Sequence, residues 1–183
     1  MTEILDAQCR HWQEAFVRNP DMFGALPSDS ARMAVETFKK EKKTVILELG
    51  GGQGRDSILF ARNGFHLTVL DCSKSAVVTI TDKARKLGLA GHITALRHDV
   101  RVALPFEDES MDACYSHMLY CMALTTSELQ FLSREVRRVL RPNGFHIYTV
   151  RHTKAPHYGK GFTGARICMK SVALSSISSA GKT

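Results

Sequence analysis

Long apolar runs are missing from this 183-residue sequence. No stretch of about eighteen consecutive apolar residues occurs, which excludes a membrane-spanning helix. The first residues carry Glu3, Asp6 and Glu14 among their apolar side chains, a pattern that a secretory signal peptide does not have. We therefore expect a cytoplasmic protein that does not associate with a membrane.

Closely spaced cysteine pairs are also missing. The sequence has five cysteines without a CxxC motif, at positions 9, 72, 114, 121 and 168. An odd and dispersed set argues against a disulfide framework and against a zinc site. We expect neither a disulfide framework nor a metal site, and we expect Cys114 and Cys121 to be ordinary buried residues.

Acidic residues are missing from the last part of the chain. Residues 151–183 hold six Lys or Arg and no Asp or Glu, although the whole chain carries a net charge of +7. The excess positive charge therefore belongs to this tail. The basic runs at 39–43 and 134–141 are better explained as solvated faces than as a phosphate-binding stripe, so we expect no nucleic-acid partner.

Short apolar segments alternate with amphipathic segments along residues 44–150. This alternation predicts a parallel sheet with helices on both faces, an α/β fold of the doubly wound, Rossmann-like type. We expect strands over 44–49, 65–70, 92–97, 112–116 and 145–150, and helices over 2–18, 30–40, 54–63, 74–87 and 126–140. In such sheets ligands bind at the carboxyl ends of the strands.

The segment after the first expected strand is rich in glycine. It reads Glu48-Leu49-Gly50-Gly51-Gly52-Gln53-Gly54. Glycines let the backbone turn sharply and approach a ligand, and the following helix directs its free amide groups at that ligand. The spacing does not match the GxGxxG pattern of dinucleotide sites, because positions 53 and 55 are glutamine and arginine. Glycine turns without a ligand are also common in α/β proteins.

This segment resembles the first motif of class I S-adenosylmethionine-dependent methyltransferases of the type 11/25-like group. Further matches follow in the family's order. Asp71 ends the second expected strand and Asp99 follows the third, while LPF and SMDA at 104–113 and LRPNG at 140–144 resemble the entries to the fourth and fifth strands. The resemblance covers residues 45–150. It implies the strand order 3-2-1-4-5 without the terminal hairpin, and S-adenosylmethionine as the cofactor.

The resemblance also implies a set of cofactor-binding residues. Asp71 would accept hydrogen bonds from the ribose hydroxyls, Asp99 would face the adenine amino group, and Val100 would line the adenine ring. Carboxylates suit these donors, although each carboxylate alone could be structural. Glu48 can orient the loop or receive the cofactor's ammonium group through water. The full set is Glu48, Gly50, Gly51, Gly52, Gly54, Asp71, Cys72, Asp99, Val100, Ser116 and His117.

Some other residues have two interpretations. His117 is the one catalytic candidate, as a general base, and Met118 could wall the adenine, but each is as often a packing residue. We expect Arg55 and Asp56 to be solvent-facing or capping residues, and His146 to be a satisfied core or face residue. The helix over 2–18, with residues 22–24, could form a lid, but packing on the sheet edge is favoured.

These features predict three regions: an N-terminal helical cap over 1–43, the cofactor-binding core over 44–151 and an irregular basic tail over 152–183. The predicted function is methyl transfer, mainly by proximity and alignment, to a small-molecule acceptor that the sequence does not identify. The alternative is a weak or inactive cofactor-binding protein, because the family's last strands are missing. The sequence does not indicate the oligomeric state.

The tail from about Gly161 onward changes character. It lacks acids and has five serines within 171–179. A shifted reading frame through 161–183 can encode an acid-containing segment with the β-type run FIVHFF, where the sixth strand belongs. We therefore expect a frameshifted, truncated form of a longer enzyme, with a naturally short, disordered tail as the alternative. A frameshift would leave the fifth strand as an unpaired edge.

Overall fold

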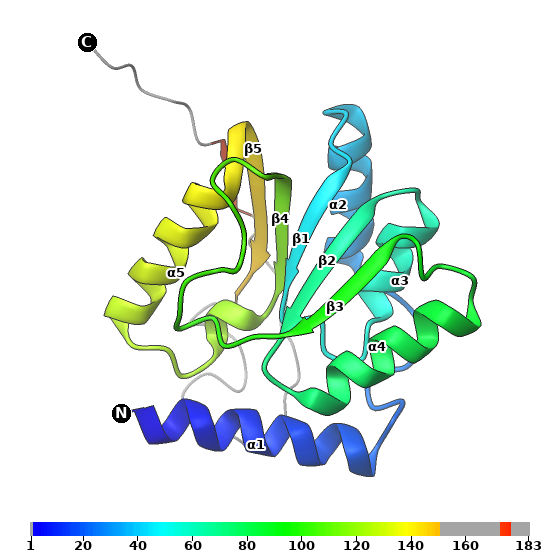
Figure 1. Cartoon of the computed structure of the whole chain (residues 1–183), viewed down its shortest axis with the longest axis vertical. Coiled ribbons are helices and arrows are strands. Elements are labelled where there is room, and N and C mark those ends of the chain that lie inside the picture. Colours follow the sequence, from blue (N-terminus) through cyan, green and yellow to red (C-terminus); the bar gives the residue numbers. More distant parts are fainter. Residues whose placement is uncertain (1, 151–172, 177–183) are drawn as a thin grey trace.

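A six-stranded sheet forms the centre of the protein (Figure 1). The structure is a computed structural model, and it describes residues 2–150 and 173–176. The strands are β1 (Val45–Leu49), β2 (His66–Asp71), β3 (Ile93–Arg97), β4 (Met111–His117), β5 (Leu140–Thr149) and β6 (Ala173–Ser176). Their order is β3-β2-β1-β4-β5-β6, and the first five are parallel. The predicted fold class and the order 3-2-1-4-5 are confirmed.

Helices cover both faces of this sheet. α2 (Asp29–Lys40), α3 (Arg55–Arg62) and α4 (Lys74–Lys86) bury their apolar sides on one face, and α5 (Thr126–Val139) covers the other. Alternation along β1 explains the two layers, because Ile46 packs with the first group of helices and Leu47 with α5. A short 3-10 helix, η1 (Leu119–Cys121), follows β4.

The helix α1 (Thr2–Arg18) lies apart from these two layers. It runs across the edge of the sheet where the parallel strands end (Figure 1). It contacts α4, and its residues face the loops that follow the strands. The helix therefore packs on an edge of the sheet, namely the edge where the parallel strands end. None of the helices within residues 2–150 is long and apolar enough to cross a membrane.

The entry to β5 differs from the expected turn. β5 begins at Leu140, and its pairing with β4 jumps from Leu140 opposite Met111 to Phe145 opposite Ala113. The residues 141–144 therefore form an irregularity inside the strand. The backbone folds back tightly there, since a Cβ on Gly144 would lie 2.8 Å from the carbonyl oxygen of Arg141.

The tail contributes one strand that the sequence did not indicate. β6 pairs antiparallel with β5, with Ser176 opposite Phe145 and Ala173 opposite Tyr148. The expectations that the tail has no strand and that β5 is an unpaired edge are therefore wrong for this segment. Backbone groups can pair without the side-chain alternation that strand prediction relies on. The rest of the proposed frameshifted region, residues 161–172 and 177–183, lies outside the described residues.

Within the described residues, a single disulfide joins α1 to the end of β2, although the dispersed cysteines argue against a disulfide framework. Cys9 and Cys72 are bonded, with their Cα atoms 6.1 Å apart. The partners are 63 residues apart, so no local cysteine spacing indicates them. Of the other two described cysteines, Cys114 is buried, as expected, whereas Cys121 is only partly buried.

Candidate functional site

A cavity of about 610 Å³ opens at the carboxyl ends of the strands. Its walls come from the loops after β1, β2, β3 and β4 and from one side of α1. The chain passes from β1 to β2 on one side and later returns to β4 on the other. The cavity thus lies where the strand order reverses, the usual ligand position in such sheets. Of the predicted site residues, the lining includes Glu48, Gly50, Gly51, Gly52, Asp71, Cys72, Asp99, Val100 and His117.

The glycines after β1 have two roles: some line the cavity, and some allow close packing against β2 and α4. Gly50, Gly51 and Gly52 line the cavity. A Cβ on Gly51 would lie 2.3 Å from Cγ1 of Val69, so a larger residue would displace β2. Gly54 does not line the cavity. It precedes α3 in a left-handed conformation, and its Cβ would lie 2.8 Å from Ile80 of α4, so its role is helix packing.

Asp71 is fixed by backbone amides at the end of β2. Its Oδ2 accepts a hydrogen bond from the amide of Gly52 at 2.9 Å, and its Oδ1 accepts one from the amide of Ser73 at 2.9 Å. Burial outweighs these two hydrogen bonds and raises the pKa of Asp71 to about 6. No basic side chain is paired with this carboxylate among the described residues.

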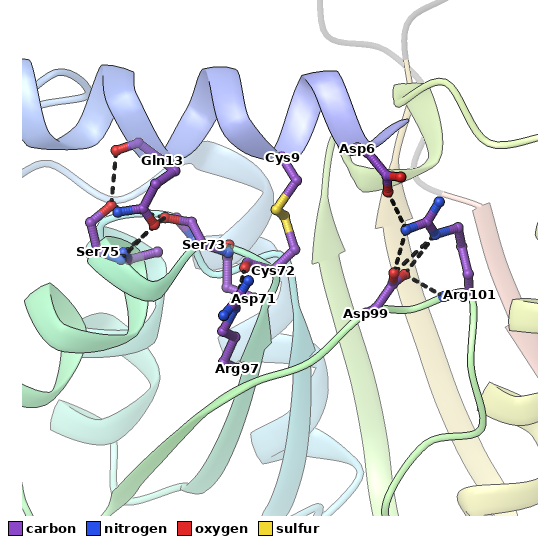
Figure 2. Close-up of a disulfide and its surroundings, with 12 residues drawn as sticks. Asp6, Cys9, Gln13, Asp71, Cys72, Ser73, Ser75, Arg97, Asp99 and Arg101 are labelled. Carbon is purple, nitrogen blue, oxygen red and sulfur yellow. Dashed lines mark hydrogen bonds and ion pairs between the residues drawn. A yellow bond between two sulfur atoms is a disulfide. The ribbon is translucent and has the colours of Figure 1, made fainter. Parts of the chain in front are cut away.

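Asp99, at the end of β3, is held in a different way. Arg101 Nε lies 3.0 Å from each of its carboxylate oxygens, and the same guanidinium donates to Asp6 of α1 at 2.5 Å (Figure 2). Burial opposes ionisation of Asp99, but the hydrogen bonds and charge of Arg101 outweigh it and lower the pKa of Asp99. The carboxylate that the resemblance assigns to adenine is thus already engaged.

Glu48 is buried at the end of β1 and accepts a hydrogen bond from the hydroxyl of Ser57 on α3. Burial raises its pKa to about 8, and the charges of Asp56 and Asp71 add to the effect. Glu48 therefore keeps its proton near neutral pH in the free protein. Its bond to Ser57 holds the strand, the loop and α3 together, in line with the loop-orienting interpretation.

Ser116 and His117 are neighbours at the end of β4, but only His117 lines the cavity. Ser116 is fully buried and does not line the cavity, so it is not brought together with the other predicted residues. His117 lines the cavity, and its Nδ1 lies 3.1 Å from Oγ of Ser30 and 3.0 Å from Oγ1 of Thr149. Met118 follows with φ of 66°, an uncommon conformation for a residue with a side chain, and also lines the cavity.

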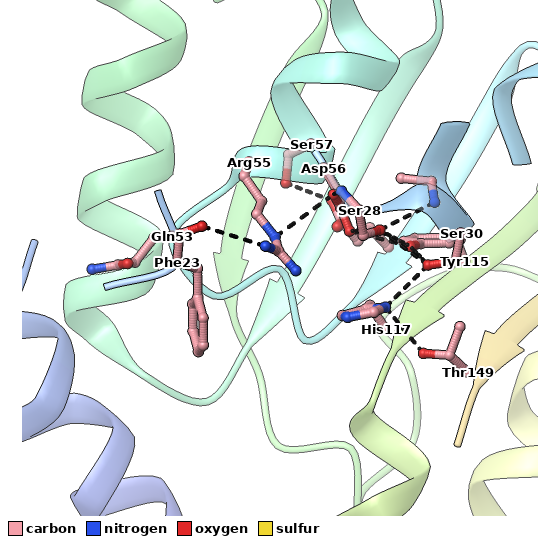
Figure 3. A network of polar contacts seen from close by, with 12 residues as sticks. Phe23, Ser28, Ser30, Gln53, Arg55, Asp56, Ser57, Tyr115, His117 and Thr149 are labelled. Carbon is pink, nitrogen blue, oxygen red and sulfur yellow. Dashed lines mark hydrogen bonds and ion pairs between the residues drawn. The ribbon is translucent and has the colours of Figure 1, made fainter. Parts of the chain in front are cut away.

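A buried polar network stands behind His117 (Figure 3). Asp56 accepts hydrogen bonds from the amide and hydroxyl of Ser28 at 2.7 and 2.8 Å and from Tyr115 Oη at 3.1 Å. The expectation that Asp56 faces solvent is wrong, because only 4% of it is exposed; its carboxylate instead binds Ser28, the N-cap residue of α2. Arg55 is not solvent-facing either: it lines the cavity, 5.6 Å from the ring centre of Phe23. The partners of Asp56 lie far away in the sequence.

Aromatic residues of α1 and the following loop close the cavity. Trp12, Phe16 and Phe23 line it, and their ring centres lie 5.6 to 6.2 Å apart. Gln13 ties the same helix to α4, because its Oε1 accepts hydrogen bonds from Ser73 and Ser75. The lid interpretation of this helix is therefore supported by its position.

His146, on β5, does not line this cavity. His146 is buried beside the rings of Tyr120 and Tyr148, and burial lowers its pKa to about 4. It is a buried residue of β5, as expected, but its Nε2 has no hydrogen-bond partner among the described residues.

The described part of the chain holds no cluster of three or more metal-ligating side chains.

The model of the methyltransferase domain family matches residues 46–144, which is more than half of the chain. The chain belongs to this family of class I S-adenosylmethionine-dependent methyltransferases. The matched range contains the glycine loop, Asp71, Asp99 and His117. The family's cofactor, S-adenosylmethionine, is the one that the sequence motifs predict.

Solved structures resemble this methyltransferase domain in fold. The cyclase SpnF is 21% identical with a TM-score of 0.65, and the match covers 84% of this chain and 63% of SpnF. For an S-adenosylmethionine-dependent methyltransferase from Aquifex aeolicus the identity is 20%, the TM-score 0.55 and the coverage 68% of both chains. Geranyl diphosphate methyltransferase in complex with GPP and sinefungin is 19% identical with a TM-score of 0.54, and the match covers 59% of this chain and 38% of that one. The chain thus spans less than two thirds of SpnF. The comparison with curated proteins gives no significant match.

Proposed function

We propose that this protein binds S-adenosylmethionine in the cavity and transfers its methyl group to a small-molecule acceptor. The observation that carries the proposal is the position of Asp71. Its carboxylate lies in the cavity wall, next to the glycine loop, within the region that matches the methyltransferase family. Each of its oxygens accepts one backbone amide hydrogen bond and keeps lone-pair capacity for a ligand.

The residues present suit this cofactor. A volume of about 610 Å³ lies within the range of roughly 300–1,000 Å³ that is usual for small-molecule sites. Asp71 would accept bonds from the ribose hydroxyls, and the loop of Gly50, Gly51 and Gly52 would accommodate the adjoining part of the cofactor without Cβ interference. Val100 and Met118 would provide apolar surface for the adenine. Asp99 would reach the adenine amino group only by sharing its oxygens with Arg101.

When bound, the cofactor supplies a methyl group on a positively charged sulfur. The chain supplies position and exclusion of water. The strand-end loops hold the ligand on one side, and α1 covers it on the other with Trp12 and Phe16. Alignment of two reactants in a closed site accounts for much of the rate enhancement in a transfer of this kind, since the leaving thioether needs no acid.

The apolar part of the lining supports a small organic acceptor. Phe23, Leu119 and Met122 line the cavity together with the two aromatic residues of α1. Arg55 adds one positive charge on this side. One structural relative is described as a geranyl diphosphate methyltransferase. Geranyl diphosphate is a small molecule with an apolar chain and an anionic group. The proposed acceptor is of the same general class, a small molecule with an apolar body.

Isothermal titration calorimetry with S-adenosylhomocysteine tests the cofactor site. We expect saturable binding, with NAD as a control ligand that does not compete. Methyl transfer from labelled S-adenosylmethionine to a panel of small molecules then distinguishes an enzyme from a protein that only binds the cofactor. Absence of S-adenosylhomocysteine binding by the folded protein would contradict the proposal.

A further inference from the structure

A chain of hydrogen bonds connects His117 to a buried carboxylate (Figure 3). Nδ1 of His117 lies 3.1 Å from Ser30 Oγ, which lies 2.9 Å from Tyr115 Oη. Tyr115 Oη lies 3.1 Å from Oδ2 of Asp56. The four residues come from β4, α2 and α3, and Ser30, Tyr115 and Asp56 are all buried. The far end of this chain, the imidazole, borders the cavity.

With the carboxylate of Asp56 as the final acceptor, one set of directions satisfies every bond in this chain. An ionised carboxylate only accepts, so the hydroxyl of Tyr115 donates to Asp56. The Tyr115 oxygen can then accept the one hydrogen of Ser30, and the Ser30 oxygen accepts the hydrogen on Nδ1 of His117. Ser28 cannot supply Ser30 with a hydrogen, because its own hydroxyl donates to Asp56 at 2.8 Å.

Thr149 is compatible with this direction. Its Oγ1 accepts a hydrogen bond from the amide of Met118 at 3.0 Å and lies 3.0 Å from Nδ1 of His117. It can act as a second acceptor for the same Nδ1 hydrogen. The lone pair of the neutral imidazole then resides on Nε2. This atom is shielded from solvent and has no hydrogen-bond partner among the described residues.

The surroundings keep the imidazole uncharged. Burial lowers the pKa of His117; the charge of Asp56 opposes this effect and that of Arg55 adds to it. These are the two charged groups that face the ring from α3, while β4, β5 and α2 present the hydroxyls of Tyr115, Thr149 and Ser30. A neutral imidazole with a free lone pair can accept a proton.

His117 and Asp71 lie on opposite sides of the glycine loop. β4 flanks β1 on one side and β2 flanks it on the other. A cofactor whose ribose is held at Asp71 would therefore leave the β4 side of the cavity for the acceptor. Phe23, Met118 and Leu119 line this region along with His117.

We infer that Nε2 of His117 is the general base of the proposed methyl transfer, and that the acceptor is a hydroxyl compound. The inference rests on the proposed function. Ser30, Tyr115 and Asp56 act as positioning residues, because they hold the ring and select the Nδ1–H form. A carboxylate or a neutral amine already has a free lone pair for attack, whereas a phenol or an alcohol must lose its proton, so a placed base favours the hydroxyl class.

The step balances without any other reactant. The acceptor's O–H bond breaks and its proton moves to Nε2, while an oxygen electron pair forms the bond to the methyl carbon. The carbon–sulfur bond breaks, and its electron pair stays on the sulfur of the leaving thioether. The imidazolium that results gives up its proton from Nε2 before the next turnover, and the neutral imidazole is restored.

Nitrogen-15 NMR of histidine-labelled protein, with S-adenosylhomocysteine present, tests the tautomer directly. The signal assigned to His117 is the one lost in His117→Gln. We expect an unprotonated Nε2 and a protonated Nδ1 in the parent protein. In Tyr115→Phe the chain is broken, so the preference for this form should weaken. Ser30→Ala serves as a second variant if Tyr115→Phe does not fold. A protonated Nε2 in the parent would overturn the inference.

The same samples separate this inference from the proposed function. If S-adenosylhomocysteine does not bind in calorimetry, the proposed function fails. If it binds and His117 has the opposite tautomer, only the inference fails. With labelled S-adenosylmethionine, a panel of phenols, alcohols, amines and thiols tests the acceptor class. We expect hydroxyl methylation at saturating cofactor to fall roughly 100-fold or more in His117→Gln. Methylation of amines or thiols alone would overturn the hydroxyl assignment, and methylation of no compound would count against the proposed function.

Discussion

Asp71 and Asp99 occupy similar places, the carboxyl ends of the neighbouring strands β2 and β3, but their surroundings differ. Asp71 is held by two backbone amides, and burial raises its pKa to about 6. Asp99 is held by the guanidinium of Arg101, which outweighs burial and lowers its pKa. An equivalent position in the sheet therefore does not give an equivalent carboxylate. Asp71 remains open to a ligand's donors, whereas a ligand must compete for Asp99.

Both carboxylates adjoin a point where α1 is attached to the sheet (Figure 2). Cys72, directly after Asp71, forms the disulfide with Cys9. Arg101, bound to Asp99, forms an ion pair with Asp6. One attachment is covalent and the other is ionic. The helix that covers the cavity is thus linked to the two residues for which the cofactor roles are proposed.

The largest expected effect comes from Asp71→Ala. This variant removes the acceptor of two hydroxyl donors, and each charge-assisted bond contributes roughly 1.5–3 kcal/mol. We expect the affinity for S-adenosylhomocysteine to fall roughly 100-fold or more in calorimetry. Asp82→Ala, which removes a half-exposed carboxylate on α4, is the matched control and should bind like the parent. Parent-like binding by a folded Asp71→Ala would show that the ribose assignment is wrong.

Reduction of the Cys9–Cys72 disulfide should have the next largest effect, on stability. The bond closes a loop with a sequence separation of 63 residues, and such a crosslink restricts the unfolded chain. We expect dithiothreitol to lower the free energy of unfolding by about 2–4 kcal/mol. Urea denaturation with and without the reductant measures this. Cys9→Ser should have the lower stability at once and should not respond to dithiothreitol; equal responses of both proteins would refute the explanation.

Asp99→Asn should weaken cofactor binding less than Asp71→Ala. Arg101 already occupies both oxygens of Asp99, so a ligand gains little net energy by competing for them. We expect a loss of about tenfold or less, close to the contribution of one hydrogen bond. Calorimetry with S-adenosylhomocysteine is the measurement. A loss as large as that of Asp71→Ala would remove the distinction between the two carboxylates.

The smallest effect is expected for Asp6→Ala. Its side chain is 42% exposed in the ion pair with Arg101, and partly exposed ion pairs contribute roughly 0.2–1 kcal/mol. The free energy of unfolding should fall by this amount at low salt, and the difference should shrink as salt screens the charges. Urea denaturation at two salt concentrations measures both. A salt-independent loss of several kcal/mol would mean that the ionic attachment is as strong as the disulfide.

The sheet and one wall of the cavity could be predicted from sequence because their signals are local. The apolar segments predicted the five parallel strands, and the family motifs predicted Asp71 and the glycine loop as strand-end residues. The position of Ser116 near the end of the fourth strand predicts a place in the site, but its side chain is fully buried and does not line the cavity. Adjacent residues of a strand point to opposite sides, so one of such a pair is often wrong.

The contacts that the sequence did not reveal join distant segments. Asp56 binds Ser28 and Tyr115, which are 28 and 59 positions away. The disulfide likewise depends on how α1 crosses the strand ends. A single sequence has no periodicity that reports such contacts. For the same reason the sequence alone does not predict the hydrogen-bond chain from His117 through Ser30 and Tyr115 to Asp56.

The pH dependence of S-adenosylhomocysteine affinity tests the central claim most directly. Hydroxyl donors bind the ionised carboxylate of Asp71, whose pKa in the free protein is about 6. Affinity should therefore rise as the pH is raised from about 5 to about 7. Glu48, with its pKa raised to about 8, keeps its proton over this range. In Asp71→Asn the rise attributable to this group should disappear. Identical profiles for the parent and Asp71→Asn would contradict the assignment of Asp71 as the cofactor's carboxylate ligand.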